Sequence, residues 1–161
     1  MGEVNSRTKD EIVQNSLQNA VIHAEQGEWV ERPRYQNGLA AFDVWASLFE
    51  KGALIIEAGK GNNIKQDTWN FAAYYASHYY SARCYARDYL KKIANGNDQL
   101  TKAAVCYETV ASLLRLVWYN KVINKNLHAD TLRVLAQNIK KAQQSEKAGI
   151  QEIITYLKRS S

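Results

Sequence analysis

The residues best suited to chemistry gather in one stretch, DTWNFAAYYASHYYSARCYARDYLKKIANGND, which runs from Asp67 to Asp98. Its six tyrosines are interleaved with alanines and with two arginines, Arg83 and Arg87. A buried tyrosine hydroxyl needs a hydrogen-bond partner, and a buried guanidinium must be paired because it keeps its charge at neutral pH. The stretch is therefore either a packed helix with a polar network or the wall of a binding site.

A carboxylate and a further cation are expected opposite this stretch, on the segment AAVCYETVASLLRLVW. A tight turn at Gly96 predicts an antiparallel helical hairpin, and counting outward from the turn places Glu108 within a turn of Arg83 and Arg87. If Arg83 pairs with Glu108, then Arg87 and Arg115 remain to bind an anion, while aromatic faces stack on a flat ring. The predicted ligand-binding residues are Trp69, Tyr75, Tyr79, Tyr80, Arg83, Arg87, Glu108, Ser112 and Arg115.

The patterns of metal-binding and catalytic sites do not occur in the sequence. His23, His78 and His128 have no second ligand at i+3 or i+4, so no metal site is predicted. Cys84 and His78 lie on different faces of one predicted helix and cannot act as a nucleophile and its base. The loop GKGNN lacks the preceding strand and the lysine-serine or lysine-threonine ending of a phosphate-binding loop. We therefore expect no enzymatic activity, no catalytic residue and no cofactor.

The charge of the chain favours small anions over nucleic acid. The 161 residues carry a formal net charge of +5 at pH 7, which attracts anions in general. The basic residues near the end of the chain are mixed with acidic ones, as on a solvated helix face. They are Lys140, Lys141, Lys147, Lys158 and Arg159, with Glu146 and Glu152 among them. No nucleic acid partner is predicted.

The cysteines and the hydropathy pattern indicate the cellular compartment of the protein. Cys84 and Cys106 have neither the spacing of a redox or metal motif nor a secretory leader beside them, which indicates reduced thiols. No apolar run approaches the roughly 18 residues of a membrane span. A cytoplasmic protein without a membrane partner is expected.

Periodic apolar residues predict five helices and no strand, which is an all-α bundle forming one domain over residues 1–161, with tails at 1–8 and 159–161. The helices are expected over about residues 9–26, 39–51, 99–119 and 129–158, with the aromatic helix between positions 67 and 96. Because small and apolar residues cover most of its circumference, the aromatic helix is expected to be long and central.

Local signals set the expected helix ends. Thr8, Asp67 and Asp98 are predicted to cap the first, third and fourth helices. Gly52 and Gly59 argue against a regular helix after residue 51, where a short turn or a covered loop is expected.

Several segments together resemble a known helical region. YQNGLAAFDVWASLFEKG, ARCYARDYL, AAVCYETVASLLRLVW and the final amphipathic LAQNIKKAQQSEKAGIQEII are similar to the region that follows the core of bacterial papain-like proteins related to the butirosin biosynthesis acyltransferase. The resemblance covers about residues 9–157 and implies a helical module. Papain-like chemistry needs a separate core with a catalytic cysteine and histidine, and neither Cys84 nor Cys106 lies in such a motif. No catalytic residue is therefore transferred.

Two functions fit these observations. The first is a non-enzymatic protein that senses or sequesters a small, anionic, nucleotide-like ligand in a pocket lined by tyrosine, tryptophan and arginine. The second is a protein-interaction or oligomerisation module, such as an accessory subunit, whose tyrosine-rich faces bind a partner or a second copy of the chain.

Overall fold

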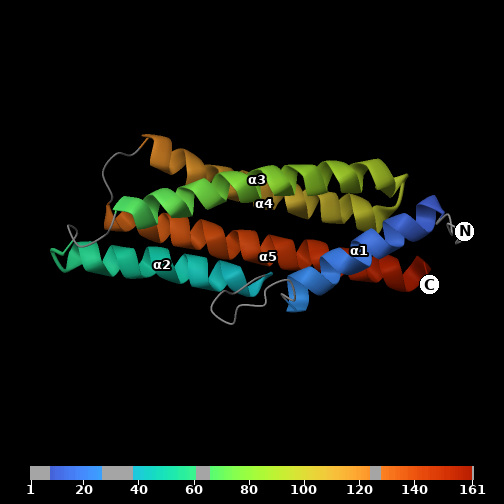
Figure 1. The fold of residues 1–161 in the computed structure, drawn as a ribbon, viewed down its shortest axis with the longest axis horizontal. Coiled ribbons are helices and arrows are strands. Elements are labelled where there is room, and N and C mark those ends of the chain that lie inside the picture. Colours follow the sequence, from blue (N-terminus) through green and yellow to red (C-terminus); the bar gives the residue numbers. More distant parts are fainter. Residues whose placement is uncertain (1–7, 27–37, 61–65, 124–127, 161) are drawn as a thin grey trace, which may run out of the picture.

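The computed structural model describes residues 8–26, 38–60, 66–123 and 128–160, except for the side chains of Gln26, residues 66–71, Ala73, residues 121–123 and Ser160. All regular structure in these ranges is α-helical, and the predicted all-α bundle of five helices is confirmed (Figure 1). The helices are α1 (Lys9–Gln26), α2 (Ala40–Glu57), α3 (Gln66–Ala94), α4 (Asp98–Ile123) and α5 (Ala129–Ser160).

The long helix α5 runs through the middle of the bundle (Figure 1). It packs against α4 on one side, and α4 in turn packs against α3 as an antiparallel hairpin, as predicted. On the other side, α2 covers the first half of α5 and α1 covers the second half, so that two consecutive helices share one position of the bundle.

Two apolar clusters form the core. The first joins Phe42 and Phe49 of α2 to the buried leucines and isoleucine of α4 and α5, such as Leu114 and Ile139. The second joins Leu17 of α1 to Leu90, Leu100, Ile150 and Ile153 on α3, α4 and α5. The first cluster therefore lies where α2 packs on α5, and the second lies where α1 packs on α5.

The cap of α1 and the turn at Gly96 are as predicted, whereas the cap of α4 is the residue before the predicted one. The Thr8 hydroxyl accepts a hydrogen bond from the Glu11 amide at 3.3 Å, and the Glu11 carboxylate accepts one from the Thr8 amide at 2.7 Å. Gly96 adopts the left-handed conformation at φ 82°. The cap of α4 is Asn97 rather than Asp98, because the Asn97 side chain accepts from the Leu100 amide at 3.1 Å. The side chain of Asp67, the expected cap of α3, lies outside the described residues.

Helix α2 is longer than predicted, since it continues through Gly52 to Glu57. A glycine inside a helix costs about 1 kcal/mol. Packing offsets this cost, because Ala53 is buried in the first cluster and Ile56 packs against it. Beyond the glycine, Glu57 forms an ion pair with Arg133 of α5 at 2.6 Å, which further ties the last turn of α2 to the bundle.

The join between α1 and α2 depends on Gly38. The Leu39 amide donates a hydrogen bond to the carbonyl oxygen of Ala24 at 3.0 Å, which connects the end of α1 to the start of α2. Gly38 sits at φ 60°, and a Cβ atom there would collide with the carbonyl oxygens of Ala24 and His23. Only glycine fits this contact without a shift of the backbone.

Candidate functional site

The Arg83 guanidinium lies inside the bundle, but its partner is not the predicted one. Its Nε and Nη2 atoms donate to the two carboxylate oxygens of Glu146 on α5, at 3.0 and 2.5 Å. The side chains of Arg83 and Glu146 are 19% and 7% exposed, respectively. The expected pair with Glu108 is therefore wrong, and a buried bidentate pair joins α3 directly to α5.

The position of Glu146 follows the apolar repeat of α5. Leu132, Ile139 and Ile153 are buried, and Glu146 shares their seven-residue spacing, so it projects toward the same side as they do. The charges around Glu146 predicted a solvated helix face, and this prediction is wrong because Glu146 is buried. The burial of Glu146 could have been predicted from the seven-residue repeat, because this repeat places its carboxylate at a core position.

Tyr107 of α4 lies beside this ion pair. Burial raises the pKa of the Tyr107 phenol, and the charge of Glu146 raises it further, while Arg83 acts in the opposite direction. The ring fits because α5 carries Gly149 there: a Cβ atom at Gly149 would lie 3.2 Å from the Tyr107 ring and 3.1 Å from Cys106 Cβ. Arg83, Tyr107 and Glu146 thus form a polar cluster where α3, α4 and α5 meet.

Burial lowers the pKa of the Arg83 guanidinium, but the charge and hydrogen bonds of Glu146 raise this pKa by more, and the net shift is upward. Arg83 therefore stays charged and already has both carboxylate oxygens of Glu146 as acceptors. The charge of Arg83 is thus neutralised by Glu146, and the pair ties α3 to α5.

Tyr79 connects the polar cluster to α2. Its ring lies 5.2 Å from the Arg83 guanidinium carbon and 6.0 Å from the ring of Trp45. The indole nitrogen of Trp45 is buried, and no acceptor for its N–H is found among the described residues. Trp45 is not among the predicted ligand-binding residues, although its place on the apolar face of α2 puts it next to the aromatic helix.

Arg87 and Glu108 meet in a separate, exposed group of charges between α3 and α4. Arg87 donates to the Asp88 carboxylate at 2.8 Å and lies 3.9 Å from Glu108. Glu108 also pairs with Lys91 at 3.1 Å. The hydrogen bond to Asp88 is the main cause of a raised pKa of Arg87. The predicted proximity of Arg87 to Glu108 is confirmed, but Arg87 is not surplus cation.

Ser112 and Arg115 lie together in an open hollow on α4. The described residues that line it are Ser112, Arg115, Leu116 and Tyr119, and its volume is about 370 Å³. The Arg115 guanidinium carbon lies 5.8 Å from the Tyr119 ring, and within the described part of the chain Arg115 has no carboxylate partner. Of the three predicted arginines, Arg115 alone combines an aromatic neighbour with an unpaired charge.

The remaining predicted ligand-binding residues do not converge on this hollow. Tyr80 packs against the first apolar cluster, and Tyr75 is 53% exposed beside Tyr74. The side chain of Trp69 lies outside the described residues. The predicted site is therefore divided into a buried ion pair, an exposed charge group and an open hollow.

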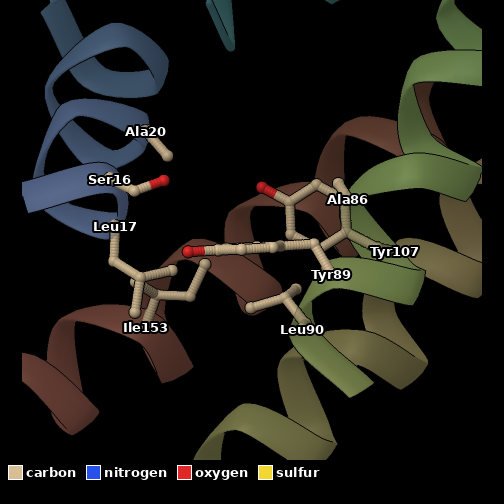
Figure 2. A pocket seen from close by; sticks show the side chains of 8 residues that line it. All are labelled: Ser16, Leu17, Ala20, Ala86, Tyr89, Leu90, Tyr107 and Ile153. Carbon is tan, nitrogen blue, oxygen red and sulfur yellow. The ribbon is translucent and has the colours of Figure 1, made fainter. Parts of the chain in front are cut away.

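A small cavity lies where four helices meet (Figure 2). Its volume is about 80 Å³, and it is lined by Ser16, Leu17, Ala20, Ala86, Tyr89, Leu90, Tyr107 and Ile153. Figure 2 shows the hydroxyls of Tyr89 and Tyr107 on the side of the cavity that faces α1. Ligand pockets usually measure at least about 300 Å³, so this cavity suits a few water molecules rather than a nucleotide.

Several aromatic rings of α3 point away from the bundle instead of lining it. The exposed residues at helical spacing are Tyr74, His78, Ser81, Ala82 and Tyr85, and we call this set the outer α3 face, whereas Tyr89, one turn further on, lines the cavity beside α1. Tyr74 and Tyr85 are 58% and 76% exposed. The buried side of α3 is formed by smaller residues such as Ala76, together with Leu90. Helix α3 is long, as expected, but α5 rather than α3 contacts most of the other helices.

Other site types have little support in the described ranges. No group of three or more histidine, cysteine, aspartate or glutamate side chains there is able to hold a metal ion. Both cysteines are free thiols, as predicted, and burial followed by the charge of Glu152 raises the pKa of Cys106. Among the helices described, none has both the length and the apolar character that crossing a membrane requires.

Comparisons with protein-family models, with curated proteins and with solved structures found no match to this chain. The resemblance to the helical region of papain-like proteins therefore stays a prediction, and function has to be argued from the residues themselves.

Proposed function

We propose that this chain is a helical protein-interaction module that binds a protein surface through the outer α3 face. The observation that carries the proposal is the exposure of α3 tyrosines to solvent, which reaches 76% at Tyr85. A surface helix of a monomeric bundle normally turns polar residues outward. Tyrosine is instead enriched at protein interfaces, because its rigid ring buries a large area and loses little conformational entropy.

The polar groups near this face support the same function. The hydroxyls of Ser77 and Ser81 donate to the carbonyl oxygens of Tyr74 and Ser77, at 2.7 and 3.1 Å. The Tyr74 ring lies 4.2 Å from the His78 ring in an edge-to-face arrangement, so the two rings form one aromatic patch. A partner could cover this patch without leaving the serine hydroxyls unsatisfied.

Photo-crosslinking tests the proposal. A photoreactive phenylalanine analogue is placed at Tyr85, and as a control at Gln151, which is exposed on α5. In the cells that make the protein, the Tyr85 position is expected to give a discrete crosslinked protein species that the Gln151 position does not give. Equal crosslinking at the two positions, or none at Tyr85, would contradict the proposal.

A second candidate function is the binding of a small aromatic anion, and the unpaired Arg115 in its hollow favours it. Calorimetric titration with nucleotides and phosphorylated metabolites tests this candidate. Binding that is weakened by about 1.5–3 kcal/mol in Arg115→Met, the size of a charged hydrogen bond, and unchanged in Lys147→Met would support it. Lys147 is the control because it is exposed on α5, away from the hollow. If no compound binds to the wild-type chain, the interaction module remains as the single candidate function.

A further inference from the structure

The turn between α3 and α4 contains an asparagine that is followed by a glycine. Asn95 and Gly96 are both exposed, and both have left-handed backbones, at φ 41° and 82°. Among the described residues, Asn95 is the one non-glycine residue with a positive φ. In the same part of the chain, the Asn95 side chain and the Gly96 N–H form no hydrogen bond. Both amide groups are therefore open to solvent, and no described partner holds either of them.

From this arrangement we infer that Asn95 is a site of spontaneous deamidation. The Gly96 nitrogen loses its proton to hydroxide and attacks the carbonyl carbon of the Asn95 side chain. A carbon–nitrogen bond forms, and the side-chain nitrogen leaves as ammonia, which gives a cyclic succinimide. Water then opens the ring at either of its carbonyl groups and leaves aspartate or an isoaspartyl link, in which the backbone runs through the side chain. The net change is the exchange of ammonia for water, so no oxidant, metal or enzyme is needed.

The surroundings of Asn95 favour this reaction, whereas those of Asn97 in the same turn do not. Gly96 has no side chain to block the approach of its nitrogen, and a Cβ atom added there would meet nothing within 4 Å. The Asn97 side chain is instead held as the cap of α4, where it accepts from the Leu100 amide at 3.1 Å. Its carbonyl oxygen also accepts from the Thr101 amide at 3.1 Å. Asn97 should therefore react much more slowly than Asn95.

The chain contains the same dipeptide at Asn37 and Gly38, which separates the effect of structure from that of sequence. Asn37 lies outside the described residues, but Gly38 is packed against the end of α1, where a Cβ atom would collide with the carbonyl oxygen of Ala24. Closing a succinimide ring turns the peptide group between the two residues, and this packing resists that turn. In the folded chain, Asn95 should therefore react faster than Asn37, although the two dipeptides are chemically identical.

The two products affect the α3–α4 hairpin differently. The Asn97 amide donates to the Ala94 carbonyl oxygen at 2.7 Å, which closes the turn. An isoaspartyl link adds a carbon atom to the backbone between these two groups, so it disturbs this hydrogen bond and the cap that Asn97 provides. Aspartate at position 95 leaves the backbone path unchanged and places a carboxylate close to Lys92 in the last turn of α3. The isoaspartyl product is therefore the one that loosens the hairpin.

Peptide mass spectrometry of the purified chain, aged at mildly alkaline pH with and without urea, tests the inference. In the folded chain, conversion at Asn95 is expected to be about tenfold faster than at Asn37, which corresponds to a barrier about 1.4 kcal/mol lower. In urea the two rates should become equal, because the packing of Gly38 is lost. No conversion at Asn95, or equal rates at the two sites in the folded chain, would overturn the inference.

The effect on the hairpin is tested with Asn95→Gly, which keeps a left-handed backbone and removes the reactive side chain. After ageing, the isoaspartyl fraction of the wild type should unfold at a lower urea concentration than fresh protein. Aged Asn95→Gly should unfold like fresh Asn95→Gly. An isoaspartyl fraction as stable as fresh protein, or the same loss in aged Asn95→Gly, would contradict the loosening of the hairpin.

Discussion

At the scale of single residues, the need for a buried counterion was predictable from the sequence, but its identity was not. An arginine among alanines and tyrosines on an apolar helix face must have an acceptor. Within the helical hairpin, the predicted acceptor was Glu108. The structure supplies Glu146, which lies 63 residues from Arg83 along the chain. The packing of α5 against α4 brings it there, and pattern counting within α3 and α4 contains no information on that packing.

Removing one member of the Arg83–Glu146 pair should destabilise the fold strongly. Glu146→Gln leaves a buried guanidinium without its counterion, and the expected loss is about 3 kcal/mol of unfolding free energy. Replacing both residues with methionine should recover most of this loss, because the desolvation cost of both charges disappears as well. Urea unfolding followed by circular dichroism measures both effects.

The control for this pair is Glu108→Gln. Its carboxylate is 51% exposed and pairs only with solvent-facing cations, so the change should stay within about 0.5 kcal/mol. A larger loss for Glu108→Gln than for Glu146→Gln would restore the pairing predicted from the sequence.

The buried phenol of Tyr107 predicts a loss of stability at alkaline pH. Its pKa is raised in the folded chain, so its contribution to stability is complete below the ordinary value of 10.0 and is lost as the pH rises toward the folded value. Above pH 10 the unfolded chain releases this proton and the folded chain does not, which costs about 1.4 kcal/mol per pH unit. Urea unfolding at several pH values should show a steeper alkaline decline for the wild type than for Tyr107→Phe. Parallel curves for the two proteins would contradict the assignment.

At the scale of helices, the sequence predicted the elements well wherever apolar period and cap agree. Helix α1 begins after Thr8 as expected, and the turn between α3 and α4 uses Gly96. The error in α2 has a definite cause: Gly52 reads as a helix breaker, whereas the tertiary contacts of Ala53 and the ion pair of Glu57 keep the helix intact. Propensity is a local quantity, and these contacts come from α5 and from the core.

Two glycines with left-handed backbones should differ in their response to alanine. Gly59 has φ 70° with nothing within 4 Å of an added Cβ, so Gly59→Ala should cost only the conformational penalty of about 1–2 kcal/mol. Gly38→Ala carries the same penalty and in addition pushes the end of α1 away from the start of α2. Its loss of unfolding free energy should therefore be larger, and urea unfolding of the two variants measures the difference. Equal losses would mean that the α1–α2 contact yields without cost.

At the scale of the whole molecule, the sequence showed that α3 is aromatic almost all round but not which side faces the core. Alanines and tyrosines are both compatible with burial, and the narrow polar strip of α3 left most of its circumference open to either interpretation. Helix α4 packs against the alanine side of α3, because small residues allow the two helices to approach closely. Tyr74, Tyr75 and Tyr85 are left exposed on the outside, and the predicted pocket becomes a predicted interface. Ser112 and Arg115 were predicted to continue the flank of α4 that bears Glu108, and both line the open hollow there.

The arrangement of the helices predicts an order of local opening that hydrogen exchange can measure. Helix α5 contacts α1, α2 and α4, and buried residues recur along its whole length and along that of α4. Among the described side chains of α1, only Leu17 and Ala24 are buried, and this helix packs mainly on α5. Because the free energy of local opening follows the buried apolar contacts that are broken, amides in α1 should exchange fastest, and those in the middle of α4 and α5 slowest. Mass-spectrometric hydrogen exchange measures this order. Equal protection of α1 and α5 would contradict it.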